Sequence, residues 1–387
     1  MRRGAWAAAL AALLTWSLAT PLVARAAERP PLHGAERAAI LAHGPWPAAA
    51  ARDGSNRVQH RRAASDFGKR LFFDARLSRD GSVSCASCHQ PERALQDGRA
   101  TPFGLLDGQR NTPGLDDVAG QRWFGWDGAH DSLWSASLAP LLNPAEMGSS
   151  ATVVARRVRE EPALRQGWRR AFDVPPPADD EAVLVGVAKA LAAWQAVLVS
   201  PRTPFDDFRD ALARGDRRAM ARYPVSAQRG LQLFVGRGRC SVCHAGARFS
   251  HGEFADIGIP FFVPGGVDAG RFAGIETVRA NPYNRLGRWA DDGGAGGWAT
   301  RHLAQEHRHF GEFKVPGLRG VARTAPYMHD GSLATLADVV RHYSELNEER
   351  LHADGERILR PLRLSAGEQA DLLAFLASLS PPAPRKR

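Results

Sequence analysis

Two short segments hold the residues with the most recognisable chemistry. Cys85-Ala86-Ser87-Cys88-His89 and Cys240-Ser241-Val242-Cys243-His244 each place two thiols three positions apart, followed at once by an imidazole. Two thiols at this spacing can add to the two vinyl groups of one haem, and the adjacent histidine can then bind the iron. The pattern predicts two covalently attached haem c groups, with His89 and His244 as proximal ligands.

A redox-active cysteine pair and half of a zinc site are the competing interpretations of each motif. A zinc site would need further cysteines or spaced histidines, and the two motifs use all four cysteines of the chain. His302, His307 and His309 are close together in the sequence, but this grouping is more typical of a solvated helix end than of a metal site. Haem attachment is therefore the favoured interpretation.

Helical patterns surround both motifs and must position them. A short helix beginning near Ser65 leads towards the first motif, and a helix over Ala227–Phe234 leads into the second, so the arrangement reads as a diverged internal repeat. Apolar residues at helical spacing predict further helices over 151–172, 180–199, 336–346 and 365–379, the last opening with a Ser-x-x-Glu capping box. Strand patterns are nearly absent. The expected fold class is mainly α, with two cytochrome-c-like haem domains and long loops.

The N-terminus has the features of an export signal. A basic start, an apolar stretch and Ala24-Arg25-Ala26 predict a signal peptide over 1–26, and hence a periplasmic protein. The apolar stretch is interrupted by polar residues and no other stretch is long enough, so no membrane span is expected. The remaining chain is divided into an N-terminal extension (27–60), an N-terminal haem domain (61–210), a C-terminal haem domain (220–380) and a disordered tail (381–387). A linker is expected over 200–224 and a glycine-rich excursion over 252–300.

The charge of the chain limits its partners. The formal net charge is +10, and removal of three arginines with the signal peptide leaves 10 − 3 = +7. This balance favours acidic partners and fast electrostatic encounter. The basic residues are scattered, without the aromatic–basic pattern of single-strand binders, so no nucleic acid is expected.

The second axial ligand of each iron distinguishes an electron carrier from an enzyme. No Met or His occurs between His89 and His130, so the first haem is expected to have an open face. The C-terminal segment offers candidate ligands to the second haem, namely Met328, His329, His342 and Tyr343.

Several sequence runs around these motifs resemble the bacterial di-haem cytochrome c peroxidase family, including its MauG-like branch. The resemblance extends in order from about residue 65 to residue 380. Its runs are Leu71-Phe72-Phe73-Asp74, Ser84 to His89, Arg110-Asn111-Thr112-Pro113, Trp126-Asp127-Gly128, Asn143-Pro144-Ala145-Glu146-Met147, Cys240 to His244, Phe313-Lys314-Val315-Pro316-Gly317-Leu318-Arg319 and Thr324-Ala325-Pro326-Tyr327-Met328-His329-Asp330-Gly331.

The resemblance implies a role for particular residues. Glu146 matches the distal carboxylate that handles the peroxide proton at the open haem, and Trp126 matches the tryptophan that relays electrons between the two haems. Asn111, Thr324 and Pro326 match an inter-domain calcium site; oxygen ligands suit this ion.

Two departures within the family indicate the branch. Peroxidases with an axial Met carry it fourteen residues after the position of His329, where this chain has Tyr343, as in MauG-like proteins. The chain also lacks the distal His that those peroxidases carry shortly before Asn111. A third departure is Ala136, which stands where the family usually has a Gln that would help to orient peroxide.

These features predict a peroxide-dependent oxidoreductase. Its electrons are expected from a protein: a small cytochrome, a copper protein, or a residue of a secreted protein substrate that is modified. The alternative is a non-catalytic di-haem electron carrier, which gains weight from Ala136.

Overall fold

The computed structural model describes residues 30–49, 52–260, 262–263, 266–355 and 358–382. The predicted signal peptide (1–26) and most of the predicted tail (381–387) lie outside these ranges. Helices dominate the described chain, and its strands are two residues long each, so the mainly α class is confirmed. No helix within these ranges has the length and apolar character needed to traverse a bilayer.

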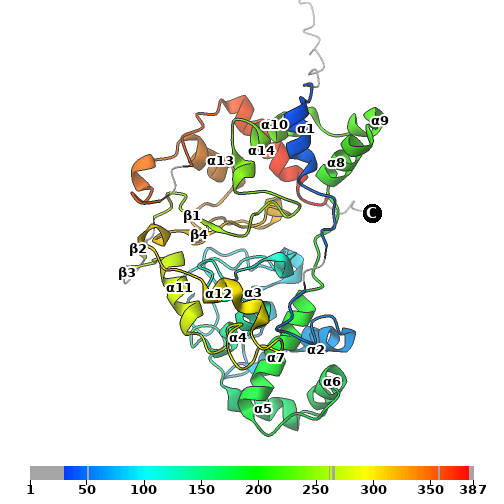
Figure 1. Ribbon diagram of the computed structural model, residues 1–387, viewed down its shortest axis with the longest axis vertical. Coiled ribbons are helices and arrows are strands. Elements are labelled where there is room, and N and C mark those ends of the chain that lie inside the picture. Colours follow the sequence, from blue (N-terminus) through cyan, green and yellow to red (C-terminus); the bar gives the residue numbers. More distant parts are fainter. Residues whose placement is uncertain (1–29, 50–51, 261, 264–265, 356–357, 383–387) are drawn as a thin grey trace, which may run out of the picture.

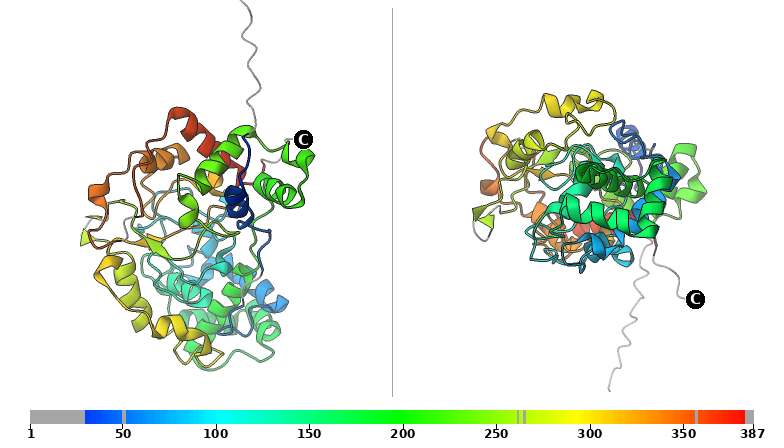
Figure 2. Two further views of the ribbon diagram at one scale, coloured as in Figure 1. Left: turned by 45° about the horizontal axis from the view of Figure 1, so that its top comes forward. Right: turned by 90° about the horizontal axis from the view of Figure 1, so that it is seen from below.

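Most of the described helices form two groups, each with its own hydrophobic core (Figure 1). The first group contains α2 (Arg62–Phe72), α3 (Cys85–Cys88), α4 (Leu133–Leu142), α5 (Ala151–Glu160), α6 (Pro162–Phe172) and α7 (Asp180–Gln195). The second contains α1 (Gly34–Leu41), α8 (Pro204–Arg214), α9 (Arg217–Met220), α10 (Val225–Val235), α13 (Leu336–Ser344) and α14 (Ala366–Ser378). In the left view of Figure 2 the red α14 lies at the top with the second group, and the cyan segment of the first group lies below it.

Each group repeats one helix crossing just before its Cys-x-x-Cys-His motif. In α2, a Cβ on Gly68 would lie 1.9 Å from the carbonyl oxygen of Ala190 in α7. In α10, a Cβ on Gly230 would lie 2.0 Å from the carbonyl oxygen of Asp371 in α14. Only glycine allows two helix backbones to approach this closely. Both glycines belong to a shared Gly-x-x-Leu-Phe sequence, so the internal repeat extends from the motifs to the helices that carry them.

Substitution of either glycine by alanine is expected to destabilise its group. The added methyl group would force α2 from α7, or α10 from α14, at a cost of about 1–3 kcal/mol or more. Gly367→Ala in α14 is the matched control, because a Cβ there would meet nothing within 4 Å. Denaturant unfolding of the haem-loaded protein measures the effect. Equal unfolding free energies for Gly230→Ala and Gly367→Ala would contradict it.

The helix expected over 151–172 is two helices, so that prediction was wrong. Pro162 begins α6, and Glu161 before it has the extended backbone (φ −74°, ψ 113°) that a following proline favours. The helix expected over 180–199 is α7, which ends at Gln195; all residues from Val183 to Gln195 are buried. The predicted helices over 336–346 and 365–379 are confirmed as α13 and α14, and the Ser365–Glu368 capping box is present.

The segment expected to be a linker, 200–224, is part of the second core. Pro204 does not break a helix but begins α8, because Thr203 caps its N-terminus by accepting from the backbone N–H of Asp206. Phe205 and Phe208 of this helix are fully buried in the second core. The division between the groups therefore falls before α8, and the predicted boundary at residue 210 falls inside this helix.

Two other segments connect the groups. In the N-terminal extension, Ile40 is buried in the second core and Val58 in the first. The excursion after the second motif contains α11 (Arg271–Ala280) and α12 (Trp298–Arg301), and it returns to the first group, where Asp291 forms an ion pair of 2.8 Å with the buried Lys189 of α7.

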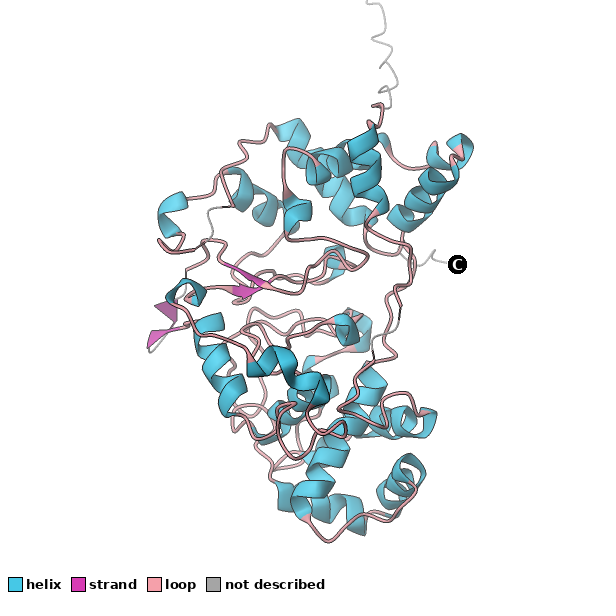
Figure 3. Ribbon diagram, viewed as in Figure 1, coloured by secondary structure: helices cyan, strands magenta, loops and turns pink. Residues whose placement is uncertain are grey.

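The strands form two small antiparallel pairs. β1 (Phe254–Ala255) pairs with β4 (Phe313–Lys314), with Phe254 opposite Lys314, and β2 (Phe262–Val263) pairs with β3 (Gly266–Val267). Figure 3 shows that loops otherwise fill the region between the two helical groups.

Candidate haem sites and active site

The two proximal histidines have nearly the same surroundings. The backbone N–H of His89 donates to Cys85 O, and that of His244 donates to Cys240 O; each N···O distance is 2.9 Å. Each Nδ1 lies within hydrogen-bonding distance of a carbonyl a few residues ahead, His89 to Leu95 O (2.9 Å) and His244 to Phe249 O (3.0 Å). With Nδ1 as the donor, Nε2 of each ring is available for a metal, the usual tautomer of a ligating histidine.

A phenylalanine from the preceding helix packs beside each ring. Phe72 lies 6.3 Å from His89 between ring centroids, and Phe234 lies 6.4 Å from His244, with interplanar angles of 41° and 40°. Burial lowers the pKa of both histidines, that of His244 to about 4. Both imidazoles are therefore neutral near pH 7, as an iron ligand must be.

Three of the four cysteines lack the lowered pKa of redox-active thiols. All four are free of disulfide bonds. Burial raises the pKa of the Cys85 and Cys240 thiols to about 12 and that of Cys88 to about 11, whereas a reactive cysteine requires a lowered pKa. Thioether bonds from these cysteines to haem vinyl groups would leave no titratable thiol behind.

The second motif lines a cavity of about 1340 Å³, larger than the roughly 300–1,000 Å³ of most small-molecule sites. Cys240, Cys243, His244 and Tyr343 all face it. Burial, and then the proximity of Cys240 and Cys243, raise the pKa of the Tyr343 phenol. A group attached to these cysteines would thus meet His244 and Tyr343 in the same cavity.

Three of the four candidate axial ligands line this cavity: Met328, His329 and Tyr343. His342 does not, because α13 turns its Nε2 to Ile257 O at 2.8 Å. The His329 ring stacks on Phe313 with centroids 3.4 Å apart, and its buried Nδ1 has no hydrogen-bond partner in the part of the chain that is described. Tyr343 is the one of the three that α13 carries.

Two buried cations beside this cavity have no counterpart in the sequence-based prediction. Arg271 is 3 % exposed, lies between the rings of Trp123 (4.4 Å) and Phe254 (4.0 Å), and donates to the carbonyl of Gly128 (2.9 Å). Lys314 donates to the Gln121 side chain, and burial lowers its pKa to about 8. Buried charges are costly unless paired. The two carboxylates of a haem bound in this cavity would be able to pair with these cations.

The burial of these two cations could not be predicted from the sequence around either residue. Lys314 belongs to one of the runs that carry the family resemblance, but its burial depends on β4 and on the loop from the first helical group. The same is true of Arg271, which begins α11.

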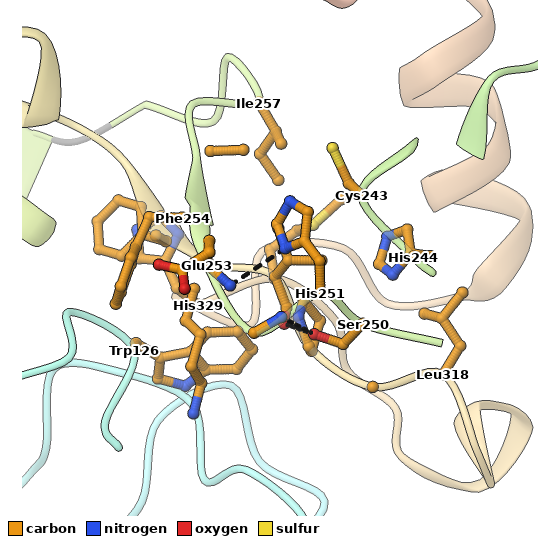
Figure 4. Close-up of a pocket in the computed structure, with 18 of the residues that line it drawn as sticks. Trp126, Cys243, His244, Ser250, His251, Glu253, Phe254, Ile257, Leu318 and His329 are labelled. Carbon is orange, nitrogen blue, oxygen red and sulfur yellow. Dashed lines mark hydrogen bonds between the residues drawn. The ribbon is translucent and has the colours of Figure 1, made fainter. Parts of the chain in front are cut away.

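Trp126 lies on the side of the cavity formed by the first helical group. In Figure 4 it stands next to His329, with His244 on the other side of the view. Its indole N–H donates to Asn111 O (2.8 Å), and its carbonyl accepts from Lys314 N (2.8 Å). The neighbouring Asp127 pairs with Arg110 at 2.6 Å, and Arg110 also pairs with Asp268 at 2.7 Å. These contacts fix the indole between the two helical groups.

Glu146 lies close to the first motif, in the turn that follows α4. Its Oε1 accepts from Asn143 Nδ2 (2.7 Å), and its carbonyl accepts from Leu105 N (3.0 Å). Burial raises its pKa, against the opposing effect of the Asn143 hydrogen bond. Its charge also adds to the effect of burial on the pKa of Cys85 and Cys88. A half-buried carboxyl group with a raised pKa therefore faces the site expected for the first haem.

The described side chains near Ala136 make contacts of their own. Trp134 is fully buried and donates to Ser55 Oγ (2.9 Å), so it is a core residue. His130 Nδ1 lies 3.1 Å from Ser135 Oγ, and Ala136 itself packs against the first core.

The three residues expected to bind calcium belong to the lining of the same cavity. Asn111, Thr324 and Pro326 all line it. The Asn111 amide N–H₂ donates to Arg99 O (2.8 Å), which turns the amide oxygen the other way. Beside them, Gln96 Nε2 donates to Ala325 O (3.0 Å), while its buried Oε1 has no partner within the described ranges.

The chain resembles known proteins over most of its length. The family model described as di-haem cytochrome c peroxidase matches residues 62–214. The methylamine utilization protein MauG of Methylorubrum extorquens is 36 % identical over 81 % of this chain and 77 % of its own. A cytochrome-c peroxidase of Pseudomonas sp. strain SCT is 32 % identical over 82 % of this chain and 81 % of its own.

A solved structure shares the fold at slightly lower identity. It is described as a MauG-like protein associated with microbial copper homeostasis, and it matches 87 % of this chain and 96 % of its own with a TM-score of 0.67 and 27 % identity. Taken with the repeated Cys-x-x-Cys-His geometry, these likenesses show that the chain belongs to the di-haem cytochrome c peroxidase family that includes MauG, and that it is a haem c oxidoreductase with two haem groups.

Proposed function

We propose that this protein is a periplasmic peroxidase that reduces hydrogen peroxide at a haem held by Cys85, Cys88 and His89, with electrons drawn from a protein. The balance is H₂O₂ + 2 H⁺ + 2 e⁻ → 2 H₂O. The haem supplies the iron that binds peroxide and the capacity to store oxidising equivalents.

Glu146 is the proposed acid–base group. In its ionised form it would accept a proton from one oxygen of the peroxide and return it to the other, departing oxygen. The observation that carries the proposal is its position: a half-buried carboxyl group with a raised pKa, next to the first motif. The absence of Met and His between His89 and His130 supports an open face there.

We assign the second haem to Cys240, Cys243, His244 and Tyr343. A phenolate ligand favours ferric and higher oxidation states, which suits a centre that shares oxidising equivalents with the first haem. This favours the MauG-like source of electrons, an oxidisable residue of a secreted protein, over a small cytochrome or copper protein. The positive charge of the chain favours an acidic partner in either case.

The state of the irons tests the proposal directly. The ferric protein as isolated is expected to show one high-spin and one low-spin haem by electron paramagnetic resonance, and its Soret band is expected to change rapidly on mixing with peroxide. Two low-spin signals and no spectral change with peroxide would instead identify a di-haem electron carrier.

Trp126 is the proposed electron relay between the haems. Trp126→Phe keeps an aromatic ring but is harder to oxidise and cannot donate to Asn111 O, so it is expected to slow the oxidation of the second haem after peroxide reacts at the first. Stopped-flow absorbance measures this step. Trp298→Phe is the control, because Trp298 lines the same cavity but is 68 % exposed. Equal rates in both variants would contradict a relay role.

We also propose a calcium ion at Asn111, Thr324 and Pro326. The support is that these residues offer oxygen donors and line one cavity, and that the nearby Gln96 Oε1 has no hydrogen-bond partner among the described residues. Export is part of the same proposal, with the mature chain beginning at Ala27.

A further inference from the structure

A cluster of metal-binding side chains lies outside the proposed haem and calcium sites. His307, His352 and Asp354 each offer one ligand atom, and these three atoms lie within 4.8 Å of one another. His307 comes from the short 3₁₀ helix His307–His309 before β4, and the other two come from the loop before α14. We propose that these three side chains form a surface site for a divalent transition-metal ion of the Cu²⁺ or Zn²⁺ class.

The backbone of the loop holds two of the ligands in position. His352 N donates to Asp256 Oδ2 (2.6 Å), which fixes this loop to the segment after β1. Asp354 N donates to His352 Nδ1 (3.2 Å), so this nitrogen carries a lone pair and the ring lies against Asp354. A histidine binds a metal through an unprotonated ring nitrogen.

The His307 side chain already contacts that of Asp354. His307 Nδ1 and Asp354 Oδ2 lie 2.9 Å apart, and their side chains are 73 % and 62 % exposed. Metal–ligand bonds of about 2.0–2.1 Å in a tetrahedral site place neighbouring ligands at about 3.3 Å. The cluster therefore needs a contraction of only about 1.5 Å at its widest, which exposed side chains can make.

The donor set selects the class of metal. Two imidazoles and one carboxylate suit Cu²⁺ and Zn²⁺, whereas Ca²⁺ and Mg²⁺ prefer sites made only of oxygen. A site for Cu⁺ would favour thiolate or thioether ligands, and all four cysteines lie in the haem motifs. With three protein ligands, a fourth position remains for water or for a group of another molecule.

The proposed metal site lies beside the cavity of the second motif. His352, Arg308 and His309 line the cavity that carries Tyr343 and His244. A metal held by His352 would thus lie at the rim of the proposed second haem site, without sharing any ligand with it. Neither the family resemblance nor the spacing of His302, His307 and His309 predicted this cluster, because His352 and Asp354 lie more than forty positions away in the sequence.

Metal binding to the untagged di-haem protein tests the proposal. After addition of Cu²⁺ and removal of loosely bound metal, we expect one retained copper per chain and a Cu²⁺ signal with nitrogen hyperfine structure in electron paramagnetic resonance. His307→Ala and His352→Ala are each expected to weaken binding at least about tenfold. Zn²⁺ is expected to compete with Cu²⁺.

His302→Ala is the matched control, since this exposed histidine is five positions from His307 but lies outside the cluster. It should retain the copper. The haem absorption spectrum of each variant shows whether the protein has folded and loaded normally, independently of copper. No retained copper in the parent protein, or the same copper affinity in the parent and both cluster variants, would overturn the proposal.

Discussion

Replacing Glu146 with Gln is expected to slow the reaction of the di-haem protein with hydrogen peroxide by about 10²–10⁴-fold, the usual contribution of a positioned acid–base group. The amide has nearly the same shape as the carboxyl group but cannot accept and return a proton. The second-order rate constant for peroxide, followed at the Soret band, measures the effect. Glu160→Gln is the control, because Glu160 is an exposed residue at the end of α5.

The pH dependence follows from the surroundings of Glu146. Burial raises its pKa and the hydrogen bond from Asn143 opposes this rise. A group that accepts a proton must be ionised, so the rate constant is expected to rise as the pH increases through this raised pKa and then to level off. In Glu146→Gln this rising limb is expected to be absent.

A substitution of Asn143 distinguishes its effect on the Glu146 carboxyl group from its effect on the shape of the turn. Asn143→Asp keeps the side-chain oxygen that accepts from Ala145 N (3.0 Å) but replaces the donor to Glu146 with a second carboxylate. A like charge raises the pKa of Glu146 further, so the rising limb should move to higher pH with its plateau retained. A uniform loss of rate at every pH would show that Asn143 acts only on the shape of the turn, and an unchanged profile in Glu146→Gln would exclude Glu146 as the proton-transfer group.

The local features of the sequence anticipated the parts of the fold that depend on short spacings. The two Cys-x-x-Cys-His motifs lie in matching surroundings, and the Ser365–Glu368 capping box begins α14. Pro162 was a local signal too, and it ends the helix that was wrongly extended across it. Pro204 has the opposite meaning, because Thr203 before it caps a helix. The identity of a proline does not decide between these outcomes; its neighbours do.

Features that depend on contacts between distant segments could not be predicted from local sequence patterns. Nothing near Phe205 shows that α8 packs in the second core, and nothing near Asp291 shows that it pairs with Lys189 in the first. The buried charges of Arg271 and Lys314 are of the same kind. Conversely, only the family resemblance selected Tyr343 among the four candidate ligands. The structure adds the reason that its neighbour His342 is a poor alternative: the Nε2 of that ring is already hydrogen-bonded to Ile257 O.

Replacing Tyr343 with Met is expected to raise the reduction potential of the second haem by tenths of a volt, since axial ligands set haem potentials over a range of about 0.8 V. A phenolate stabilises ferric iron, whereas a neutral thioether raises the potential. Redox titration, followed separately at the absorption bands of the two haems, measures the change. The first haem is expected to keep its potential and its high-spin signal.

The proton of Tyr343 gives a second signature of the same ligand. Burial raises the pKa of this phenol, so a phenolate released from reduced iron takes up a proton, and the potential should fall by about 59 mV per pH unit for one proton and one electron. Tyr343→Met should abolish this slope, and Tyr343→Phe should convert the low-spin signal of the second haem to high-spin. Tyr327→Phe removes a hydroxyl from the same cavity, one that donates to Val321 O (2.9 Å), and should change neither property. If Tyr343→Phe instead kept both the low-spin signal and the slope, the ligand would have to be Met328 or His329, and the case for the MauG-like branch would fail with it, because that case depends on the phenolate.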